Sequence, residues 1–207
     1  MILEGIKHGA EPLPLFEGLD GGTAAPSPGT LDSFVVPPGC PAGKYRCIVA
    51  DPPWDVKRGC EWASNGPTRD LEYPTMSIEE IAALRIPAHQ DCVMFIWTIN
   101  KYLRETYDIA EAWGFRPCQL LTWAKQPRGI GLGGNFTQTS EHILMARRGS
   151  VTPKRRWDTS WWAWRRARHS QKPEDFQNTL EKMYHGPYLE MFARRRRAGW
   201  DTWGNEV

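Results

Sequence analysis

The sequence has few cysteines and no long apolar segment. Its five cysteines are odd in number, and no two of them stand at the C-x-x-C spacing of a zinc site or a redox pair. We therefore expect no bound metal and no disulfide framework, and a reducing cytoplasm is the expected location. The longest apolar run near the middle of the chain, residues 92–97, is far too short to cross a membrane.

The first 43 residues lack both a secretory signal and a regular pattern. No basic region followed by a long apolar segment occurs there, so no signal peptide is expected. Gly, Pro, Ala, Ser and Thr dominate residues 9–43, which predicts an irregular N-terminal lead-in over residues 1–43. Residues 44–207 have a length that suits one domain.

Positive charge is concentrated in the C-terminal half, although the net charge is only +2. Residues 1–43 hold one lysine against five acidic residues, whereas residues 147–199 hold fourteen lysines and arginines against five. Such asymmetry favours an anionic partner, with nucleic acid the leading candidate. The alternative is an ordinary solvated basic surface.

Short apolar runs alternate with helical patterns along residues 44–207. Ser77 and Glu80 form a capping box that predicts a helix start, and Asn100 is expected to cap the next helix. Predicted strands cover residues 44–50, 92–98, 118–124, 142–147, 188–193 and 200–203, with helices beginning near residues 77, 100 and 173. The alternation favours an α/β fold with a mostly parallel sheet.

The first predicted strand runs directly into Asp51-Pro52-Pro53-Trp54. The two prolines fix the backbone and remove two N–H donors, so the strand ends in a rigid turn. The turn combines a carboxylate, backbone carbonyls and an aromatic ring at the carboxyl end of a strand, where open α/β sheets bind ligands. The alternative is a strand-ending turn whose aspartate is incidental.

The same four residues fit the chemistry of an exocyclic amine on adenine or cytosine. Such an amine is a poor nucleophile because its lone pair is delocalised into the ring. Hydrogen bonds from the NH₂ group to the Asp51 carboxylate and the Pro52 carbonyl would restore its nucleophilicity. Trp54 would offer a face on which the base stacks, worth about 1–3 kcal/mol.

These residues, together with five further segments, resemble a family of N6-adenine methyltransferases. The family includes the catalytic subunit of the mRNA N6-adenosine methyltransferase, and its C-terminal pattern here most resembles phage and bacterial members. The resemblance covers about residues 44–205. The matching segments are, in order, residues 49–55, 73–77, 93–98, 140–142, 169–174 and 190–205.

The resemblance implies a Rossmann-like S-adenosylmethionine-dependent fold with helices on both faces. It also implies a permuted order, in which the catalytic strand precedes the cofactor strand at residues 188–194. Asp51, Pro52, Pro53 and Trp54 would be catalytic. The cofactor would contact Asp51, Lys172, Glu190, Phe192, Arg194 and Asn205.

Substrate contacts are expected from both the resemblance and the charge pattern. Tyr73 matches a family position near the target base, and Glu141 matches one beside the substrate loop, while Thr137 stands where members usually carry an arginine. The basic, tryptophan-rich stretch 154–168 and the run Arg194 to Arg197 would fit phosphate contacts, although some tryptophans are equally expected in the core. The residues expected to bind substrate are Trp54, Tyr73, Glu141, Arg165, Arg166 and Arg168.

The resemblance thus implies an enzyme that methylates adenine N6 in DNA. Adenine in RNA is the nearest alternative, and cytosine N4 is disfavoured because related enzymes usually place serine at the position of Asp51. A non-catalytic nucleic-acid-binding subunit is the alternative of another class. The oligomeric state stays open, with either a homo- or a hetero-oligomer compatible with the sequence.

Overall fold

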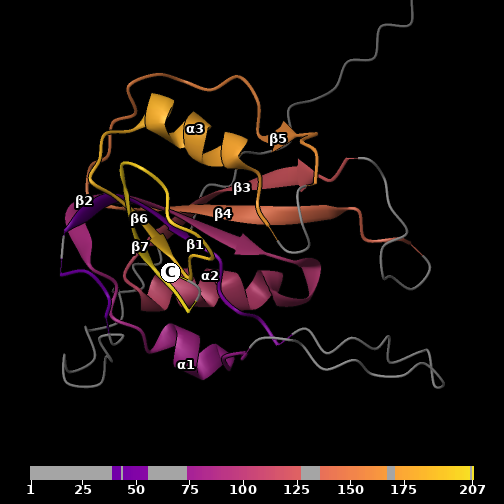
Figure 1. Ribbon diagram of the computed structural model, residues 1–207, viewed down its shortest axis with the longest axis horizontal. Coiled ribbons are helices and arrows are strands. Elements are labelled where there is room, and N and C mark those ends of the chain that lie inside the picture. The colour runs from indigo at the N-terminus through magenta and orange to yellow at the C-terminus, as the bar shows by residue number, and fades with distance from the viewer. Residues whose placement is uncertain (1–38, 43, 56–73, 127–135, 167–170, 206) are drawn as a thin grey trace, which may run out of the picture. The chain divides into compact units, whose positions relative to one another are not determined.

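Seven strands form one sheet within the part of the chain that this computed structural model describes, namely residues 39–42, 44–55, 74–126, 136–166, 171–205 and 207 (Figure 1). Their order across the sheet is β5-β3-β4-β2-β1-β6-β7. The strands are β1 Tyr45–Ala50, β2 Ala88–Thr98, β3 Arg116–Ala124, β4 Ser140–Arg148, β5 Trp161–Trp162, β6 Tyr188–Met191 and β7 Trp200–Trp203.

All strands of this sheet except β4 run in the same direction. β1 pairs in parallel with both β2 and β6, and β6 pairs in parallel with β7. β4 lies antiparallel between β2 and β3, and β3 is parallel to the short edge strand β5. The prediction of a mostly parallel sheet is therefore confirmed, with one reversed strand that the sequence pattern did not reveal.

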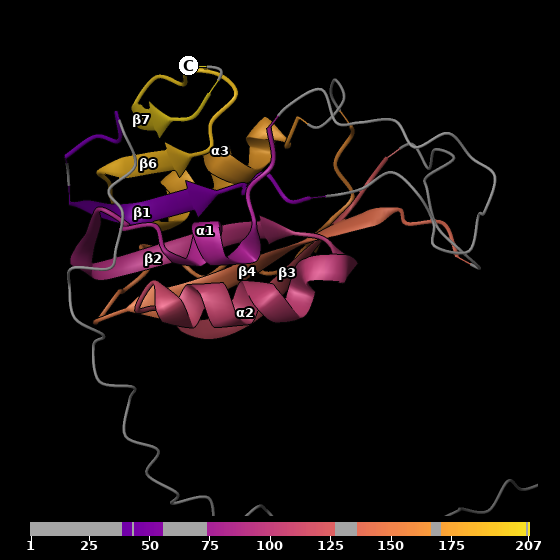
Figure 2. The ribbon, with the colours of Figure 1, turned by 90° about the horizontal axis from the view of Figure 1, so that it is seen from below.

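Helices cover both faces of the sheet, as predicted (Figures 1 and 2). The helices α1 (Ile78–Ala82) and α2 (Leu103–Ala112) pack against one face, where Ile81 and Ile109 join a buried cluster. The helix α3 (Glu174–Met183) packs against the other face through Phe176 and Leu180. None of the helices in the described segments is long and apolar enough to cross a membrane.

Side chains of β1 alternate between these two faces. Ile48 and Ala50 join the cluster on the α1 and α2 side, whereas Cys47 and Val49 join the cluster on the α3 side. Successive side chains of a strand point to opposite faces. Because Ala50 faces α1 and α2, the next side chain, Asp51, faces α3. The end of β1 thereby directs a carboxylate under α3.

Local details of the helices agree with the sequence in one case and differ in another. Ser77 and Glu80 form the predicted capping box at the start of α1. Asn100 does not cap α2: it begins a 3₁₀ turn, Asn100–Tyr102, that leads into the helix. Its amide oxygen instead lies 2.8 Å from Nε2 of His142, so a contact across the chain replaces the local cap. The predicted N-terminal lead-in falls mainly outside the described residues.

Candidate active site

A pocket lies under α3 where β1 and β6 end. Its empty volume is about 490 Å³, part of which is open to solvent. Its walls carry two carboxylates, a lysine, two arginines and aromatic rings. The lining residues are Val49, Asp51, Trp97, Gln171, Lys172, Pro173, Phe176, Gln177, Glu190, Phe192, Arg194 and Arg195. The pocket brings together five of the six predicted cofactor residues, the exception being Asn205.

The Pro-Pro turn at the pocket is held by three backbone hydrogen bonds. Asp51 N–H donates to the Met191 carbonyl (3.4 Å), Trp54 N–H to the Pro52 carbonyl (2.8 Å) and Met76 N–H to the Pro53 carbonyl (3.1 Å). The Pro52 carbonyl thus already accepts one bond, but a carbonyl oxygen has two lone pairs and can accept another. The turn is therefore rigid and keeps one acceptor available.

Trp54 does not present the open stacking face predicted for it. Its side chain is only 5% exposed, and its ring stacks on Tyr102 with centroids 5.1 Å apart. Its indole N–H donates to the Trp97 carbonyl at 3.1 Å. A large ring next to a turn buries more apolar surface in the core than at an open edge. Trp54 therefore fixes the turn to the core.

Four charged side chains alternate in sign in a row that starts in the pocket at Asp51 and Lys172 and extends beyond it. Lys172 Nζ lies 2.9 Å from Asp51 Oδ1 and 3.1 Å from Glu141 Oε2. Lys125 Nζ lies 2.5 Å from the other oxygen of Glu141. Lys172 also stands over the ring of Trp97, 5.4 Å from its centroid. We call Asp51, Lys172, Glu141 and Lys125 the charge chain.

Burial and charge act on these groups in opposite directions. Burial raises the pKa of Asp51 above its ordinary value, although Lys172 partly offsets this rise. Burial would also raise the pKa of Glu141, but its two lysine partners outweigh burial and lower this pKa to about 2. Burial disfavours the charged form of Lys172, yet the two carboxylates outweigh it and raise its pKa. Asp51 is thus the one carboxylate of the charge chain that is easier to protonate than usual.

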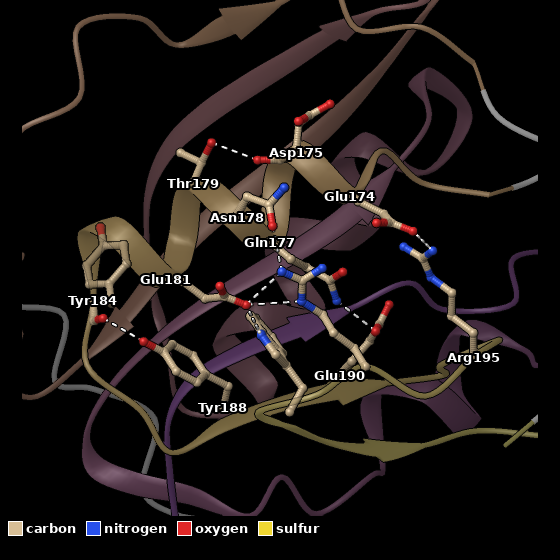
Figure 3. A network of polar contacts seen from close by, with 12 residues as sticks. Glu174, Asp175, Gln177, Asn178, Thr179, Glu181, Tyr184, Tyr188, Glu190 and Arg195 are labelled. Atoms are coloured by element: carbon tan, nitrogen blue, oxygen red, sulfur yellow. Dashed lines mark hydrogen bonds and ion pairs between the residues drawn. The ribbon is translucent and has the colours of Figure 1, made fainter.

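The end of β6 forms the far wall of the pocket. Glu190 accepts a hydrogen bond from Gln177 of α3 at 2.7 Å, and burial raises the pKa of its carboxyl group (Figure 3). Phe192 has a φ of 61°, a backbone conformation that costs a bulky residue about 1–3 kcal/mol and that clusters at functional sites. Asn205 is exposed and is not among the lining residues, so its cofactor contact stays a prediction.

Two arginines of the predicted phosphate-binding run are bound to α3 instead. Arg195 pairs with Glu174 at the start of that helix (Figure 3). Arg197 lies 2.8 Å from Glu181, which also accepts a hydrogen bond from Trp200 at 2.7 Å. Both arginines thus have internal partners on the neighbouring helix, and their phosphate contacts stay a prediction.

Of the other predicted substrate residues, two are exposed, two lie outside the described residues, and one belongs to the charge chain. Arg165 and Arg166 are exposed and follow β5 at the edge of the sheet. Tyr73 and Arg168 lie outside the described residues. Glu141, predicted beside the substrate loop, belongs to the charge chain.

Sequence reasoning missed three residues of the pocket region. Gln177 is 5% exposed and bonds to Glu190, and its spacing from Leu180 and Tyr184 on the buried face of α3 could have revealed it. Lys125 directly follows β3, and this position at the end of a strand could have identified it from the sequence. Trp97 looked like an ordinary core residue of β2 and carried no signal of its contact with Lys172.

Gly204 should be required for the shape of the pocket wall. A Cβ at this position would stand 2.2 Å from the carbonyl oxygen and 2.5 Å from the nitrogen of Ala193, which lies between Phe192 and Arg194. We expect Gly204→Ala to lower the affinity for the methyl donor that the resemblance implies about tenfold or more, and the unfolding free energy by about 1–3 kcal/mol. Calorimetric titration and thermal denaturation measure the two effects.

Gly199 provides the matched control for that substitution. Its φ of +78° strains any side chain, but a Cβ there meets nothing within 4 Å. Gly199→Ala should therefore cost stability, about 1–2 kcal/mol, without changing donor affinity. Equal donor affinities for the two variants would show that Gly204 does not shape the pocket.

Comparison with known proteins identifies the family. The family model described as MT-A70 matches residues 45–206. The Type II methyltransferase M.MunI of a Mycoplasma species is 29% identical in an alignment of 191 residues, and the match covers 82% of this chain and 81% of that protein. A putative N(6)-adenosine-methyltransferase MT-A70-like protein of Medicago truncatula is 29% identical over 175 residues, and an N(6)-adenosine-methyltransferase MT-A70-like protein of Drosophila melanogaster is 28% identical over 176.

The last two matches each cover 80% of this chain but only 27% of the relative, so the chain spans about a quarter of those proteins. The family model, in contrast, spans most of the described chain, from the first residue of β1 to beyond the end of β7. The chain belongs to the MT-A70 family of methyltransferases.

Proposed function

We propose that this methyltransferase transfers a methyl group from S-adenosylmethionine to the N6 amine of adenine in DNA. The observation that carries the proposal is the Asp51 carboxylate at a rigid Pro-Pro turn, inside a pocket that also holds Lys172 and Glu190. DNA is preferred over RNA because M.MunI, named as a type II methyltransferase, is matched over 81% of its own length. RNA is the second candidate, supported by the relatives named for N(6)-adenosine.

The groups that line the pocket fit S-adenosylmethionine. Its amino-acid end carries a carboxylate that suits Lys172, and its ribose hydroxyls suit a carboxylate acceptor such as Glu190. Phe192 supplies an apolar wall, and Arg194 lines the same space. The strand β6 would then be the cofactor strand and β1, which precedes it in sequence, the catalytic strand.

Asp51 and Pro52 would prepare the target amine. S-adenosylmethionine, when bound, supplies an electrophilic methyl group on a positively charged sulfur. The Asp51 carboxylate and the remaining lone pair of the Pro52 carbonyl accept hydrogen bonds from the NH₂ group, which returns its lone pair to nitrogen. After transfer the nitrogen carries one proton too many, and the carboxylate of Asp51, with its raised pKa, can hold that proton until solvent removes it.

The substrate would approach from the edge of the sheet where β1 ends. In duplex DNA the amine of adenine is paired inside the helix, so the base has to be extruded before it can reach Asp51. Arg165 and Arg166 are exposed beyond β5 and suit phosphate contacts. Tyr73 and Arg168 remain proposed substrate contacts, and a cytoplasmic location fits the free cysteines among the described residues.

Radiolabelled methyl transfer tests the proposal. Purified protein and labelled S-adenosylmethionine are incubated with duplex DNA, single-stranded DNA and RNA of equal adenine content. We expect label in DNA and little in RNA. Label in RNA alone would replace the DNA assignment by the second candidate, and no label in any nucleic acid would favour a non-catalytic subunit.

Glu190 should contribute to cofactor affinity through its negative charge. We expect Glu190→Gln to weaken S-adenosylmethionine binding about tenfold to a hundredfold, because a hydrogen bond to a charged group is worth about 1.5–3 kcal/mol. Calorimetric titration measures the affinity. Glu181→Gln is the control: it weakens the contacts of the same helix with Arg197 and Trp200 but leaves the pocket intact. Unchanged affinity in Glu190→Gln would remove Glu190 from the cofactor site.

A further inference from the structure

Three chain segments form a ledge that extends the sheet beyond the ends of β3 and β5. The ledge consists of residues 125–126, 136–139 and 164–166. On one side, Lys125 N–H donates to the Thr139 carbonyl at 2.8 Å. On the other side, Gln126 N–H donates to the Trp164 carbonyl at 3.1 Å and Arg166 N–H to the Gln126 carbonyl at 2.7 Å. The three segments therefore lie side by side.

The ledge lies at the same edge of the sheet as the pocket. β3 and β5 run in the direction of β1, and β4 runs against them. β3 and β5 therefore end, and β4 begins, at the edge of the sheet where β1 ends (Figure 2). Lys125 belongs to the ledge and at the same time to the charge chain that leads to Asp51. A nucleic acid seated on the ledge would therefore reach the pocket.

One side chain of the ledge is apolar and almost fully in water. Phe136 is 89% exposed, whereas the other exposed large hydrophobic residues of the described chain are Trp161 at 60% and Tyr107 at 37%. Phe136 stands three residues before Thr139, and so within about 10 Å of it. Its ring has no polar atom, so water gives it no compensating hydrogen bond.

Exposed arginines accompany this ring. Arg165 and Arg166 are both exposed on the third segment of the ledge. Arginines that hold phosphates, next to an apolar side chain that enters a base step, are a pattern by which proteins unstack and kink a duplex. The ledge therefore combines the two chemical elements that base extrusion needs, next to the pocket that would receive the base.

We infer that Phe136 inserts into duplex DNA and fills the space that the extruded adenine leaves. The inference rests on the proposed function and adds a positioning residue to it. Phe136 does not touch the reacting amine: it stabilises the opened duplex by stacking on the neighbouring bases. Its contribution should therefore be large only where the target adenine starts out paired and stacked.

The test compares one substitution on two forms of the same DNA. Wild type and Phe136→Ala are assayed for label transfer on unmethylated, linearised plasmid DNA, either as duplex or after heat denaturation and rapid cooling. We expect Phe136→Ala to lose about tenfold or more in kcat/KM on the duplex, from lost stacking, and less than about threefold on the denatured strands. Phe136→Trp should restore most of the duplex activity.

Tyr107→Ala is the matched control, because it removes an exposed ring from α2 and should change neither rate. Equal losses on duplex and denatured DNA for Phe136→Ala, or no rescue by Phe136→Trp, would overturn the inference. Activity of wild type on denatured strands only would also overturn it. Failure of the proposed function itself is distinguishable, because wild type would then label neither form of the DNA.

Discussion

Replacement of Asp51 by asparagine should abolish methyl transfer while the protein stays folded. The amide keeps the shape of the side chain but loses the negative charge and one acceptor oxygen, so the target amine is no longer activated. We expect kcat to fall about a thousandfold or more, within the range typical of a positioned acid–base group. Single-turnover label transfer measures the rate, and calorimetric titration should still detect S-adenosylmethionine binding.

Asp201→Asn is the matched control for Asp51→Asn. Asp201 accepts a hydrogen bond from the Tyr45 hydroxyl at 2.6 Å and is not among the residues that line the pocket. Its replacement removes a carboxylate from the same sheet and should leave the rate within about twofold, as for surface changes away from a site. Asp51→Ala should behave like Asp51→Asn. Transfer at the wild-type rate by either Asp51 variant would contradict the mechanism.

Removal of the Lys172 charge should have the second largest effect. Lys172→Met leaves Asp51 and Glu141 facing each other without the cation between them. The three side chains keep 15–22% exposure, so we expect a loss of about 3 kcal/mol in unfolding free energy, the low end for a broken buried pair. Donor affinity should fall at least tenfold, because the pocket loses the lysine proposed to bind the methionine carboxylate.

The same variant should shift the pH dependence of transfer in a fixed direction. Transfer needs ionised Asp51, so activity is lost as the pH falls through the pKa of this carboxyl group, which burial already raises. Lys172 lowers that pKa, and its removal must raise it further. The acid limb of kcat should therefore move to higher pH in Lys172→Met, as measured by pH–rate profiles from pH 5 to 9.

Two further substitutions serve as controls for the pH dependence of Lys172→Met. Lys172→Arg keeps the charge and should keep the acid limb within about half a pH unit of wild type, since the charge on Asp51's neighbour is unchanged. Lys182→Met removes an exposed lysine near the end of α3 and should change neither the profile nor the affinity. An acid limb that moves to lower pH in Lys172→Met would contradict the electrostatic account of the site.

Much of the fold could be predicted from local sequence patterns. Helix α1 follows from its capping box, and β1, β2 and β6 follow from short apolar runs bounded by turns. The two-residue strand β5 was not predictable, because a pair of tryptophans carries no period and pairs with β3 only through tertiary contacts. The reversal of β4 was not predictable either, since an apolar run reads the same in both directions.

That reversal decides where Glu141 stands. Glu141 is the second residue of β4, so in a parallel strand it would lie at the opposite edge of the sheet from Asp51. The antiparallel direction of β4 instead places Glu141 next to Lys172. The residues of the charge chain were visible in the sequence, but their contacts depend on a strand direction that no local pattern encodes.

The packing of Trp54 could not be predicted from the sequence. Its place directly after Pro53 suggested a ring at an open edge, whereas the chain turns back and stacks it on Tyr102 in the core. The sequence held no sign of Tyr102 as its partner, because the two rings are 48 residues apart in the chain and meet only after β2 is in place. The role of the Asp51 carboxylate could be predicted from the sequence, but the side-chain packing around it could not.

Nucleoside analysis tests the central claim most directly. Unmethylated duplex DNA is incubated with S-adenosylmethionine and either wild type or Asp51→Asn, digested to nucleosides and examined by mass spectrometry. Our account predicts N6-methyldeoxyadenosine with wild type and none above background with Asp51→Asn. N4-methyldeoxycytidine as the product, or equal amounts of methylated adenine from the two proteins, would contradict it.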